Sequence, residues 1–390
     1  MKRRTLLKTS LLASFYLKHI FSTSEKVQAK FCESTQKSFD LLEVRGSYEQ
    51  IGYQIGKVFG ANIRQIIQRR SGWHSKLINI LNNNKGRHFS KELLRLTQKH
   101  FPHILKEVKG MADGAGVDFN HLWVMCIKSE LLAHDYNTPG CSSIFYQDNG
   151  KVWLFHNEDG HAAYDGLMFV VKVLPPSGVS FISQVYPGII TGNGPSLNIK
   201  GVIQTTNYIG STRSEIGIPR YVIGRAILEA KNAKEAVEIA IMQPRAYPYH
   251  HHIGSMVDQS YFSIETTPDS TQVKEPKGLY FHTNHLIFKR TQNYKYEDNE
   301  YKNTSSISRY EVIEEKLKTL DLHQTKPEDL LEILSSHQNA PYSPWRHPQG
   351  DIRGMTLGTA FFDLREGIFR LYKGNPCKAV KNQLYVNLEF

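Results

Sequence analysis

The dipeptide Gly140-Cys141 carries the most informative chemistry of this chain. A long stretch of helical pattern ends just before it, and a β-rich remainder begins directly after it. A cut between the two residues would leave Cys141 as a new N-terminus, with its thiol beside its own α-amino group. Because an α-amino group titrates near neutrality, it can serve as the base that a thiol nucleophile needs. The alternative is a small apolar cysteine packed at the start of a strand.

Composition is typical of a folded, soluble protein: of 390 residues, 40% are hydrophobic and 22% are charged. The net charge of +11 is concentrated at the N-terminus, where residues 1–29 hold six basic residues against one glutamate. No basic tract is interleaved with aromatic residues, which argues against nucleic acid as a partner. The four cysteines are too few for a disulfide scaffold. Export would permit one bridge among Cys32, Cys126 and Cys377, and the pairing stays open.

Residues 1–29 predict an export signal. Arg3-Arg4 and the residues around this pair resemble a twin-arginine signal, and a modest apolar stretch from Leu11 to Phe21 follows. Val27-Gln28-Ala29 offers small residues at the spacing that a signal peptidase accepts. The apolar stretch is too short and too charged to form a stable membrane span. We therefore expect an exported, periplasmic protein, with an uncleaved basic N-terminus as the alternative.

Hydrophobic periodicity divides the chain at Cys141. Helices are expected at 47–70, 90–112 and 118–134, the first with a capping box formed by Ser47 and Gln50. Short β-rich runs follow, with a long helix from Pro219 to about Met242 among them. The expected strands are 143–146, 152–156, 167–173, 180–185, 202–208, 253–257, 261–266, 279–283, 357–364 and 367–372. Two later helices are expected at 304–320 and 327–336. The pattern predicts an α+β layer architecture.

Several motifs occur in a characteristic order, and together they resemble one known family. They are Gly140-Cys141, Asn157-Glu158-Asp159, the segment 218–230, Thr283-Asn284-His285, Ser308-Arg309-Tyr310, Arg346-His347-Pro348 and Gly374-Asn375-Pro376-Cys377. The set is similar to the autoproteolytic acyltransferases and amide hydrolases related to acyl-coenzyme A:6-aminopenicillanate (isopenicillin N) acyltransferase, within the N-terminal-nucleophile hydrolases. The resemblance covers nearly all of residues 40–380. It implies a four-layered αββα sandwich, with a helical chain 30–140 and a catalytic chain 141–390.

The resemblance also implies catalytic roles. Cys141 would be the nucleophile, and Asp159 would orient its freed amine. Asn207 and Asn284 would lie near the oxyanion site, where a side-chain amide is a good donor. Arg309 would be a fixed cation that lowers the thiol pKa. Each has an ordinary alternative: a turn aspartate, a buried asparagine that ties strands together, and a helix-surface arginine.

Three further residues are expected to support the site: His156, Asn157 and Ser308, the last in self-cleavage. His156 stands where the related choloylglycine hydrolases have arginine, so a bile-acid or penicillin V specificity is not inferred. His250-His251-His252 suggests a metal site, but consecutive histidines on a strand alternate faces, so the three cannot converge on one ion. We expect neither a metal nor a cofactor. Aromatic residues at Tyr247–Tyr249 and Tyr342–Trp345 are candidates for an acyl pocket or for core packing.

The sequence therefore predicts an exported zymogen that cuts itself and then acts as a cysteine amidohydrolase or acyltransferase. Its substrate would be a small linear amide or acyl-thioester, and its two chains would stay partners after cleavage. An acyl-enzyme on Cys141 would pass its acyl group to water or to an amine, and water exclusion would decide between them. The alternative is a catalytically inactive periplasmic ligand-binding protein on the same scaffold.

Overall fold

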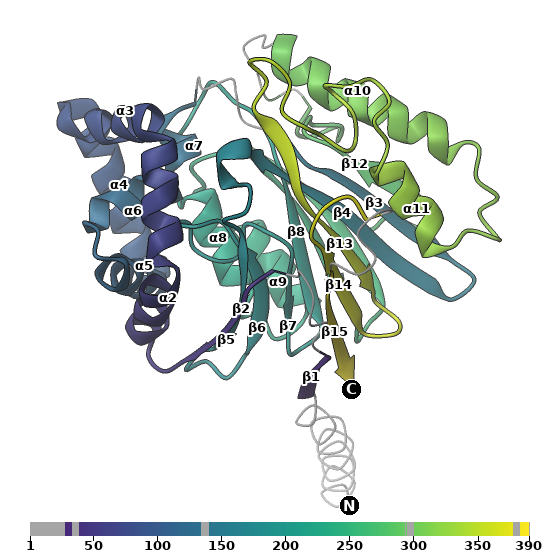
Figure 1. Cartoon of the computed structure of the whole chain (residues 1–390), viewed down its shortest axis with the longest axis horizontal. Coiled ribbons are helices and arrows are strands. Elements are labelled where there is room, and N and C mark those ends of the chain that lie inside the picture. Colours follow the sequence, from purple (N-terminus) through teal and green to yellow (C-terminus); the bar gives the residue numbers. More distant parts are fainter. Residues whose placement is uncertain are drawn as a thin grey trace, which may run out of the picture.

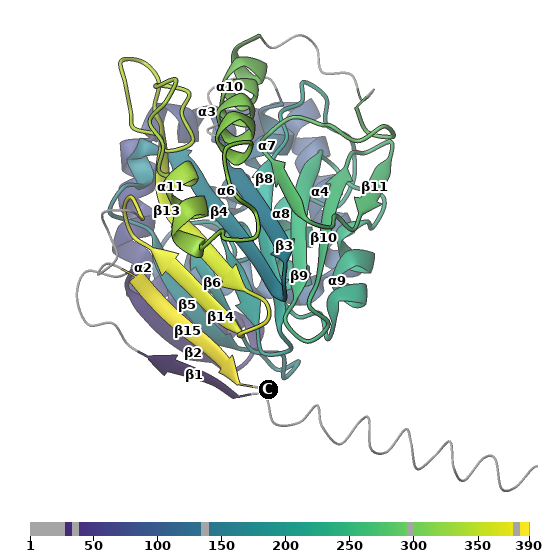
Figure 2. The ribbon, with the colours of Figure 1, turned by 90° about the vertical axis from the view of Figure 1, so that its right-hand side faces the viewer.

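The computed structural model describes residues 28–32, 39–133, 140–292, 294, 300–376 and 383–389. Two β-sheets face each other, and helices cover the outer face of each (Figure 1). Helices α2 to α6 lie outside one sheet, while α10 and α11 lie outside the other, as the second view also shows (Figure 2). The four-layered αββα sandwich of an α+β fold is confirmed.

Within the described residues, the first sheet has seven strands, and all of its pairings are antiparallel. Its order is β1 (Gln28–Cys32), β15 (Gln383–Glu389), β14 (Ile368–Tyr372), β13 (Gly354–Asp363), β4 (Lys151–His161), β3 (Ser142–Asp148) and β12 (Leu279–His282). Strand β3 starts directly after Cys141, and Ser142 pairs with Asn157 on β4. Asp159, farther along β4, pairs with Thr356 on β13. These two registers bring the second polar motif alongside the nucleophile candidate.

The second sheet has eight strands in the described part of the chain, and among these β2 and β5 are the pair that runs parallel. Its order is β11 (Thr271–Lys274), β10 (Ser260–Thr266), β9 (Tyr249–Ser255), β8 (Val202–Tyr208), β7 (Ser196–Asn198), β6 (Phe181–Val185), β5 (Phe169–Leu174) and β2 (Leu41–Arg45). A single continuous core of buried apolar side chains includes residues from both sides of Cys141. Phe59 stacks on Phe169, for example, with ring centroids 3.6 Å apart.

The helices mostly bury one face each, although every residue of the helix Arg220–Ile227 is buried. They are α2 (Tyr48–Arg69), α3 (Ser71–Asn82), α4 (Asn84–His100), α5 (Pro102–Ala115), α6 (Phe119–Cys126), α7 (Lys128–Leu131), α8 (Arg220–Ile227), α9 (Ala233–Ala240), α10 (Glu300–Leu317) and α11 (Pro327–Leu334). The expected capping box of Ser47 and Gln50 is present at α2. Helices α2 and α5 approach so closely that a Cβ on Gly52 would lie 1.9 Å from the carbonyl oxygen of Glu107. Glycine is therefore required there, and the contact fixes the position of α5.

Several expected elements are wrong in their extent. The expected helix 118–134 is divided into α6 and α7, because Ile127 between them departs from helical backbone angles. The helix 90–112 is two helices, because Pro102 supplies no N–H and restricts the residue before it. The long helix after Pro219 is also two, because the side chain of Asn232 caps a new helix by accepting from the backbone N–H of Glu235 at 2.9 Å. The strand expected at 253–257 runs instead from Tyr249 to Ser255. Local periodicity alone did not reveal these breaks.

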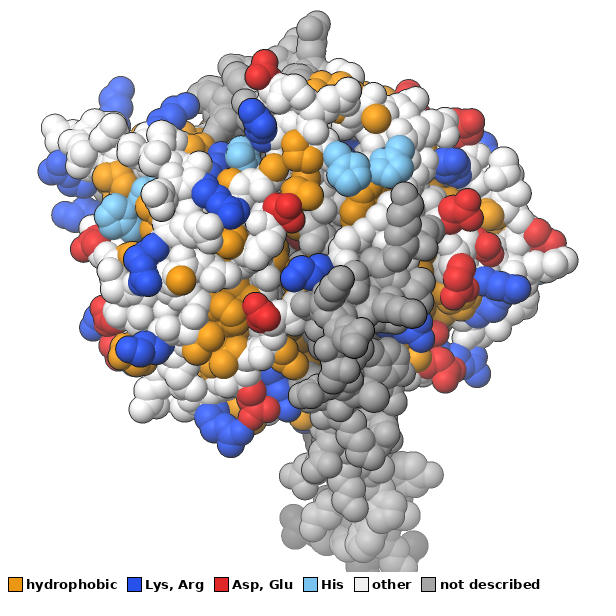
Figure 3. All heavy atoms as spheres, in the orientation of Figure 1, with side chains coloured by type: hydrophobic (Ala, Val, Ile, Leu, Met, Phe, Trp, Pro, Cys, Tyr) orange, Lys and Arg blue, Asp and Glu red, His pale blue; other side chains and the backbone are white. Residues whose placement is uncertain are grey.

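No helix among the described residues is long and apolar enough to span a bilayer. The expected signal segment lies outside the described residues, apart from Gln28 and Ala29 at the start of β1. On the face drawn in Figure 3, basic side chains lie scattered among acidic and uncharged ones.

Candidate active site

Cys141 is buried at the point where three elements meet. Its Sγ lies 3.9 Å from Oε1 of Glu158 and 4.0 Å from the carbonyl oxygen of Asp159, both on β4. Arg309 of α10 donates from Nη1 to the carbonyl oxygen of Cys141 at 2.6 Å, and Asn207 of β8 donates to the same oxygen at 3.4 Å. The structure thus brings residues from three distant segments of the sequence to Cys141.

Gly140 and Cys141 are held in place by a second set of contacts. Arg309 also donates to the hydroxyl of Ser142 at 2.8 Å and to Oδ1 of Asn284 at 2.6 Å. Asn284 in turn donates from Nδ2 to the carbonyl oxygen of Tyr208 at 2.7 Å. A Cβ on Gly140 would lie 2.1 Å from Oδ1 of Asn284, so any other residue would clash there. The amide of Asn284 therefore lies against the Gly140-Cys141 junction.

Asp159 is a buried carboxyl group with one unused oxygen. Its Oδ1 accepts a hydrogen bond from the hydroxyl of Thr356 at 2.7 Å, whereas Oδ2 has no hydrogen-bond partner among the described residues. Burial raises the pKa of Asp159 to about 6, although Arg346 and Arg309 act to lower it. A buried acceptor without a donor is uncommon, and it leaves room for one more hydrogen bond.

The Cys141 thiol is held in its protonated form. Burial raises its pKa well above the usual value, and the negative charges of Glu158 and Asp159 raise it further. The charge of Arg309 lowers the pKa of the thiol, as expected. Its effect is smaller than that of burial, of Glu158 or of Asp159. In the uncut chain, the thiol therefore needs a base before it can act as a nucleophile.

A chain of hydrogen bonds leads away from Glu158 into the second sheet. Oε2 of Glu158 contacts Nε2 of His156 at 3.1 Å, and Nδ1 of His156 contacts the hydroxyl of Ser143 at 2.8 Å. Ser143 donates to Oδ1 of Asn207 at 3.0 Å, and Nε2 of His252 contacts the same oxygen at 3.1 Å. Glu158 was part of a recognised sequence motif, but nothing in the sequence indicated that its carboxylate would face the thiol.

Two of the expected supporting residues do not contact Cys141. Asn157 ties β4 to α11, because its Nδ2 donates to the carbonyl oxygens of Leu334 and Pro344 at 2.8 and 2.9 Å. Ser308 is half-buried, and its side chain has no hydrogen bond within the described part of the chain. Ser306, two residues earlier on α10, is the buried serine, and its hydroxyl accepts from the backbone N–H of Asn284 at 2.7 Å.

A cavity opens beside Cys141 and has about 60 Å³ of free volume. Its lining includes Glu158, Tyr186, Tyr249 and Arg220. Among the aromatic residues considered for an acyl pocket, Tyr249 lines this cavity. Trp345 lines a different cavity, together with Phe39 and Met168.

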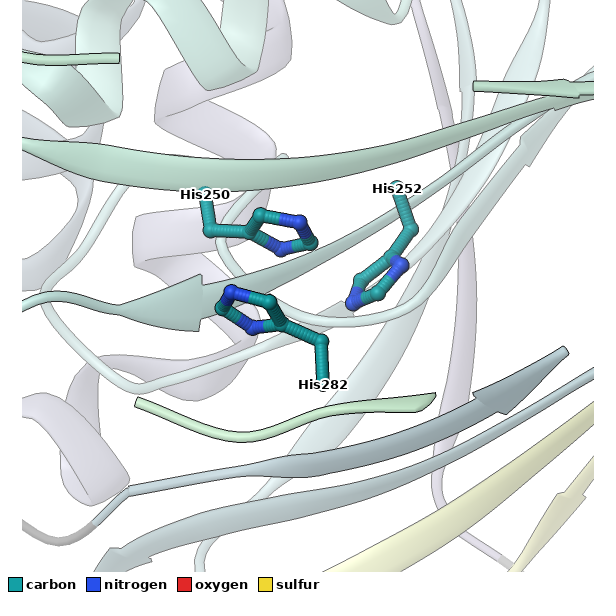
Figure 4. A group of neighbouring side chains, drawn as sticks. All are labelled: His250, His252 and His282. Atoms are coloured by element: carbon teal, nitrogen blue, oxygen red, sulfur yellow. The ribbon is translucent and has the colours of Figure 1, made fainter. Parts of the chain in front are cut away.

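Three buried histidines gather close to the site (Figure 4). His250 and His252 lie on one face of β9, and His282 of β12 points toward them, with one ligand atom of each ring within 4.8 Å of the others. Nδ1 of His282 contacts the carbonyl oxygen of Thr283 at 2.7 Å, and Nε2 contacts Oε1 of Glu265 at 3.2 Å. Both His282 nitrogens thus already have an oxygen partner within the chain, so neither is free for a metal ion in this arrangement. The sequence argument considered His251 and missed His282.

Two comparisons relate this chain to known proteins. A family model described as "Acyl-coenzyme A:6-aminopenicillanic acid acyl-transferase" matches residues 145–378, beginning just after Cys141. The "Beta-alanyl-dopamine/carcinine hydrolase" of Drosophila melanogaster is 25% identical over 375 residues, which span 87% of this chain and 94% of that protein.

Solved structures with similar folds include a conjugated bile acid hydrolase from Clostridium perfringens, at 12% identity and a TM-score of 0.40, over 64% of this chain and 96% of that one. Another is the penicillin V acylase from Agrobacterium tumefaciens, at 9% identity and a TM-score of 0.35, over 60% and 83% of the two chains. The family match spans more than half of the chain. The chain therefore belongs to the acyl-coenzyme A:6-aminopenicillanic acid acyl-transferase family, and it is an enzyme of the amide-hydrolase and acyltransferase kind.

Proposed function

We propose that the chain is an exported, self-processing cysteine amidohydrolase or acyltransferase with Cys141 as its N-terminal nucleophile. The observation that carries the proposal is the unused Oδ2 of Asp159 beside Cys141. Cleavage after Gly140 would create an α-ammonium group at Cys141, and such a group needs a buried acceptor. Asp159 supplies one, and it would then hold the amine in position as a base.

The reaction would begin when the α-amine takes the thiol proton. The thiolate would attack the acyl carbonyl of a linear amide or acyl-thioester, and Asn207 and Asn284 would donate to the oxyanion. The leaving amine or thiol would depart with a proton, and water or an amine would take the acyl group from Cys141. Because the base is an α-amine, we expect activity to rise with pH through the neutral range.

The two chains, 30–140 and 141–390, would remain together after the cut. The core supports this, because apolar side chains from both chains share one buried cluster. Cleavage would therefore free the new terminus without separating the layers of the sandwich.

Intact-mass measurement tests the proposal. The wild type should show a cut between Gly140 and Cys141, and Cys141→Ala should remain a single chain without turnover. Cys126→Ala is the matched control, because Cys126 is also a buried free cysteine and lies on α6. An active wild type that stays as one chain would refute self-processing.

A substrate panel tests the enzymatic part. β-Alanyl amides, suggested by the name of the Drosophila relative, should be compared with N-acyl amino acids, acyl-thioesters and β-lactams by release of the amine or thiol. An inactive binding protein would stay uncut and release nothing. Export is tested by fractionation of cells with Arg3 and Arg4 both changed to Lys, which should keep the protein in the cytoplasm.

A further inference from the structure

Arg220, the first residue of α8, is a buried cation with unused donors. Its Nη2 donates to the hydroxyl of Tyr221 at 2.8 Å, whereas Nε and Nη1 have no hydrogen-bond partner among the described residues. Its guanidinium carbon lies 4.5 Å from the ring centroid of Tyr249 and 4.8 Å from that of Tyr208. All four residues line the cavity that contains Cys141.

No carboxylate of the described residues forms an ion pair with the Arg220 guanidinium. Glu130 accepts at 2.9 Å from the backbone N–H of Arg220, but burial raises the pKa of Glu130 and disfavours its charged form. The cavity carboxyls Glu158 and Asp159 already accept hydrogen bonds, from Tyr186 and Thr356 respectively. A buried cation without a counterion is costly, so an anion from outside the chain would be bound strongly.

We propose that Arg220 binds a carboxylate of the substrate, so that the preferred substrates are amides or acyl-thioesters that carry a carboxylate. Two further cations, Arg70 and Lys128, line the same cavity and favour entry of an anion. The guanidinium keeps unused N–H donors on Nε and Nη1, and charge-assisted hydrogen bonds from such donors to a carboxylate are strong. This inference rests on the proposed function and names its substrate class.

Alkylation of Cys141 tests this inference with reagents that differ only in charge. A thiolate displaces iodide from iodoacetate or iodoacetamide and forms a thioether. 3-Bromopropionate and its amide are a second, longer pair of reagents, from which the thiolate displaces bromide. On an ordinary thiol the neutral reagents react faster. In the wild type we expect a carboxylate reagent to react at least about tenfold faster than its amide, with a rate that saturates as the reagent concentration rises. Intact mass of the 141–390 chain gives the rates.

Arg220→Met should reverse this preference, and Arg220→Lys should retain part of it. Arg45→Met is the control, because Arg45 is exposed and pairs with Glu43 away from the cavity. Equal rates for the two reagents in the wild type, or an unchanged preference in Arg220→Met, would overturn the carboxylate site. Failure of Cys141 to react with any reagent would instead count against the proposed nucleophile.

A second inference follows from the uncut junction. Before cleavage the nitrogen of Cys141 belongs to the peptide bond, so it cannot be the base for its own release. The thiol is protonated because burial raises its pKa. The side-chain acceptor that contacts its Sγ is Oε1 of Glu158, at 3.9 Å, and this oxygen also accepts from the hydroxyl of Tyr186 at 2.5 Å.

We infer that Glu158 accepts the thiol proton in the self-cleavage step. The thiolate then attacks the carbonyl carbon of Gly140, and a C–S bond forms. The C–N bond breaks, and the proton held by Glu158 goes to the departing nitrogen. Water hydrolyses the resulting thioester, which leaves a carboxylate on Gly140 and a free thiol on Cys141. This step also rests on the proposed function.

The test follows self-cleavage of purified precursor in Glu158→Gln. We expect at least about a hundredfold slower cleavage, with a residual rate that rises steadily with pH where the wild-type rate levels off. Glu130→Gln is the control, because Glu130 is a second buried carboxyl that does not contact Sγ. Unchanged melting temperature would separate a chemical effect from a folding defect.

Hydroxylamine identifies the step that fails, because it cleaves a thioester but not a peptide bond. Glu158→Gln precursor should remain intact in hydroxylamine. Cleavage at the wild-type rate, or release by hydroxylamine, would overturn the role of Glu158. A wild-type precursor that never cuts itself would instead refute the self-processing proposal.

Discussion

Two arginines of the same short helix, Arg220 and Arg225, lie in opposite electrostatic surroundings. Both are buried on α8, five residues apart. Arg225 pairs with Glu107 of α5 at 2.8 Å and with Glu229 at 2.8 Å, so its charge is compensated from two sides. Arg220 has aromatic neighbours and two unused donors.

The difference separates a structural charge from a functional one. Around Arg225 every charge has an opposite partner within the chain, and the group joins α5 to α8. Around Arg220 and Asp159 polar atoms are left without partners, and both residues line the cavity of Cys141. Unsatisfied buried groups cost stability, and we infer that a ligand or a reaction intermediate completes those that line this cavity.

The largest stability effect is expected at Arg225. Arg225→Met would leave Glu107 buried without its cation, which should lower the free energy of unfolding by about 3–5 kcal/mol. Arg220→Met removes an uncompensated charge and should change it by less than about 1 kcal/mol. Urea unfolding of both variants at pH 7 provides the measurement. If both variants lost the same free energy of unfolding, the proposed difference between Arg220 and Arg225 would be wrong.

Asp159→Asn should separate stability from activity. The folded-state pKa of Asp159 is about 6, above its ordinary value of 3.8, so the native state holds the proton more tightly. Its contribution to stability is therefore full below about pH 4 and is lost as the pH rises through 6. In the uncut Cys141→Ala background, Asp159→Asn replaces the ionised carboxylate by a neutral amide. The free energy of unfolding at pH 7 should therefore rise by up to about 3 kcal/mol.

In the active background the same change should reduce turnover about a hundredfold or more, because the amine loses its charged acceptor. Glu107→Gln is the control, and it should lower stability at the same pH because Arg225 loses its partner. If Asp159→Asn were less stable than the wild type but fully active, the role of Asp159 would be structural, like that of Arg225.

The smallest effect on activity is expected from a substitution at His285. Burial lowers the pKa of His285 to about 4, and its Nδ1 contacts the hydroxyl of Ser306 at 2.8 Å rather than the thiol. His285→Ala should therefore retain activity within about tenfold of the wild type. Initial rates at pH 7 provide the check, with self-cleavage as a folding control. Complete loss of turnover in a normally processed protein would favour a Cys-His dyad over the α-amine.

Much of the site was predictable because it depends on short motifs at strand ends. Cys141 precedes β3, as the local turn and strand pattern predicted. Asp159 was expected only through the family resemblance, because the expected strand ended at residue 156, whereas β4 continues to His161. Arg309 and Asn284 were expected through the family resemblance, and the structure places both beside the junction.

The sequence by itself determined the α+β class, the change from helices to strands at Cys141 and the positions of the main motifs. These follow from periodicity and turn chemistry, which are local. Only the tertiary structure decided that Glu158 faces the thiol, that Ser306 rather than Ser308 is buried at Asn284, and that His282 joins His250. These contacts join strands and helices far apart in the chain. The partners of a buried polar group depend on sheet register and layer packing, and neither is encoded in any single segment.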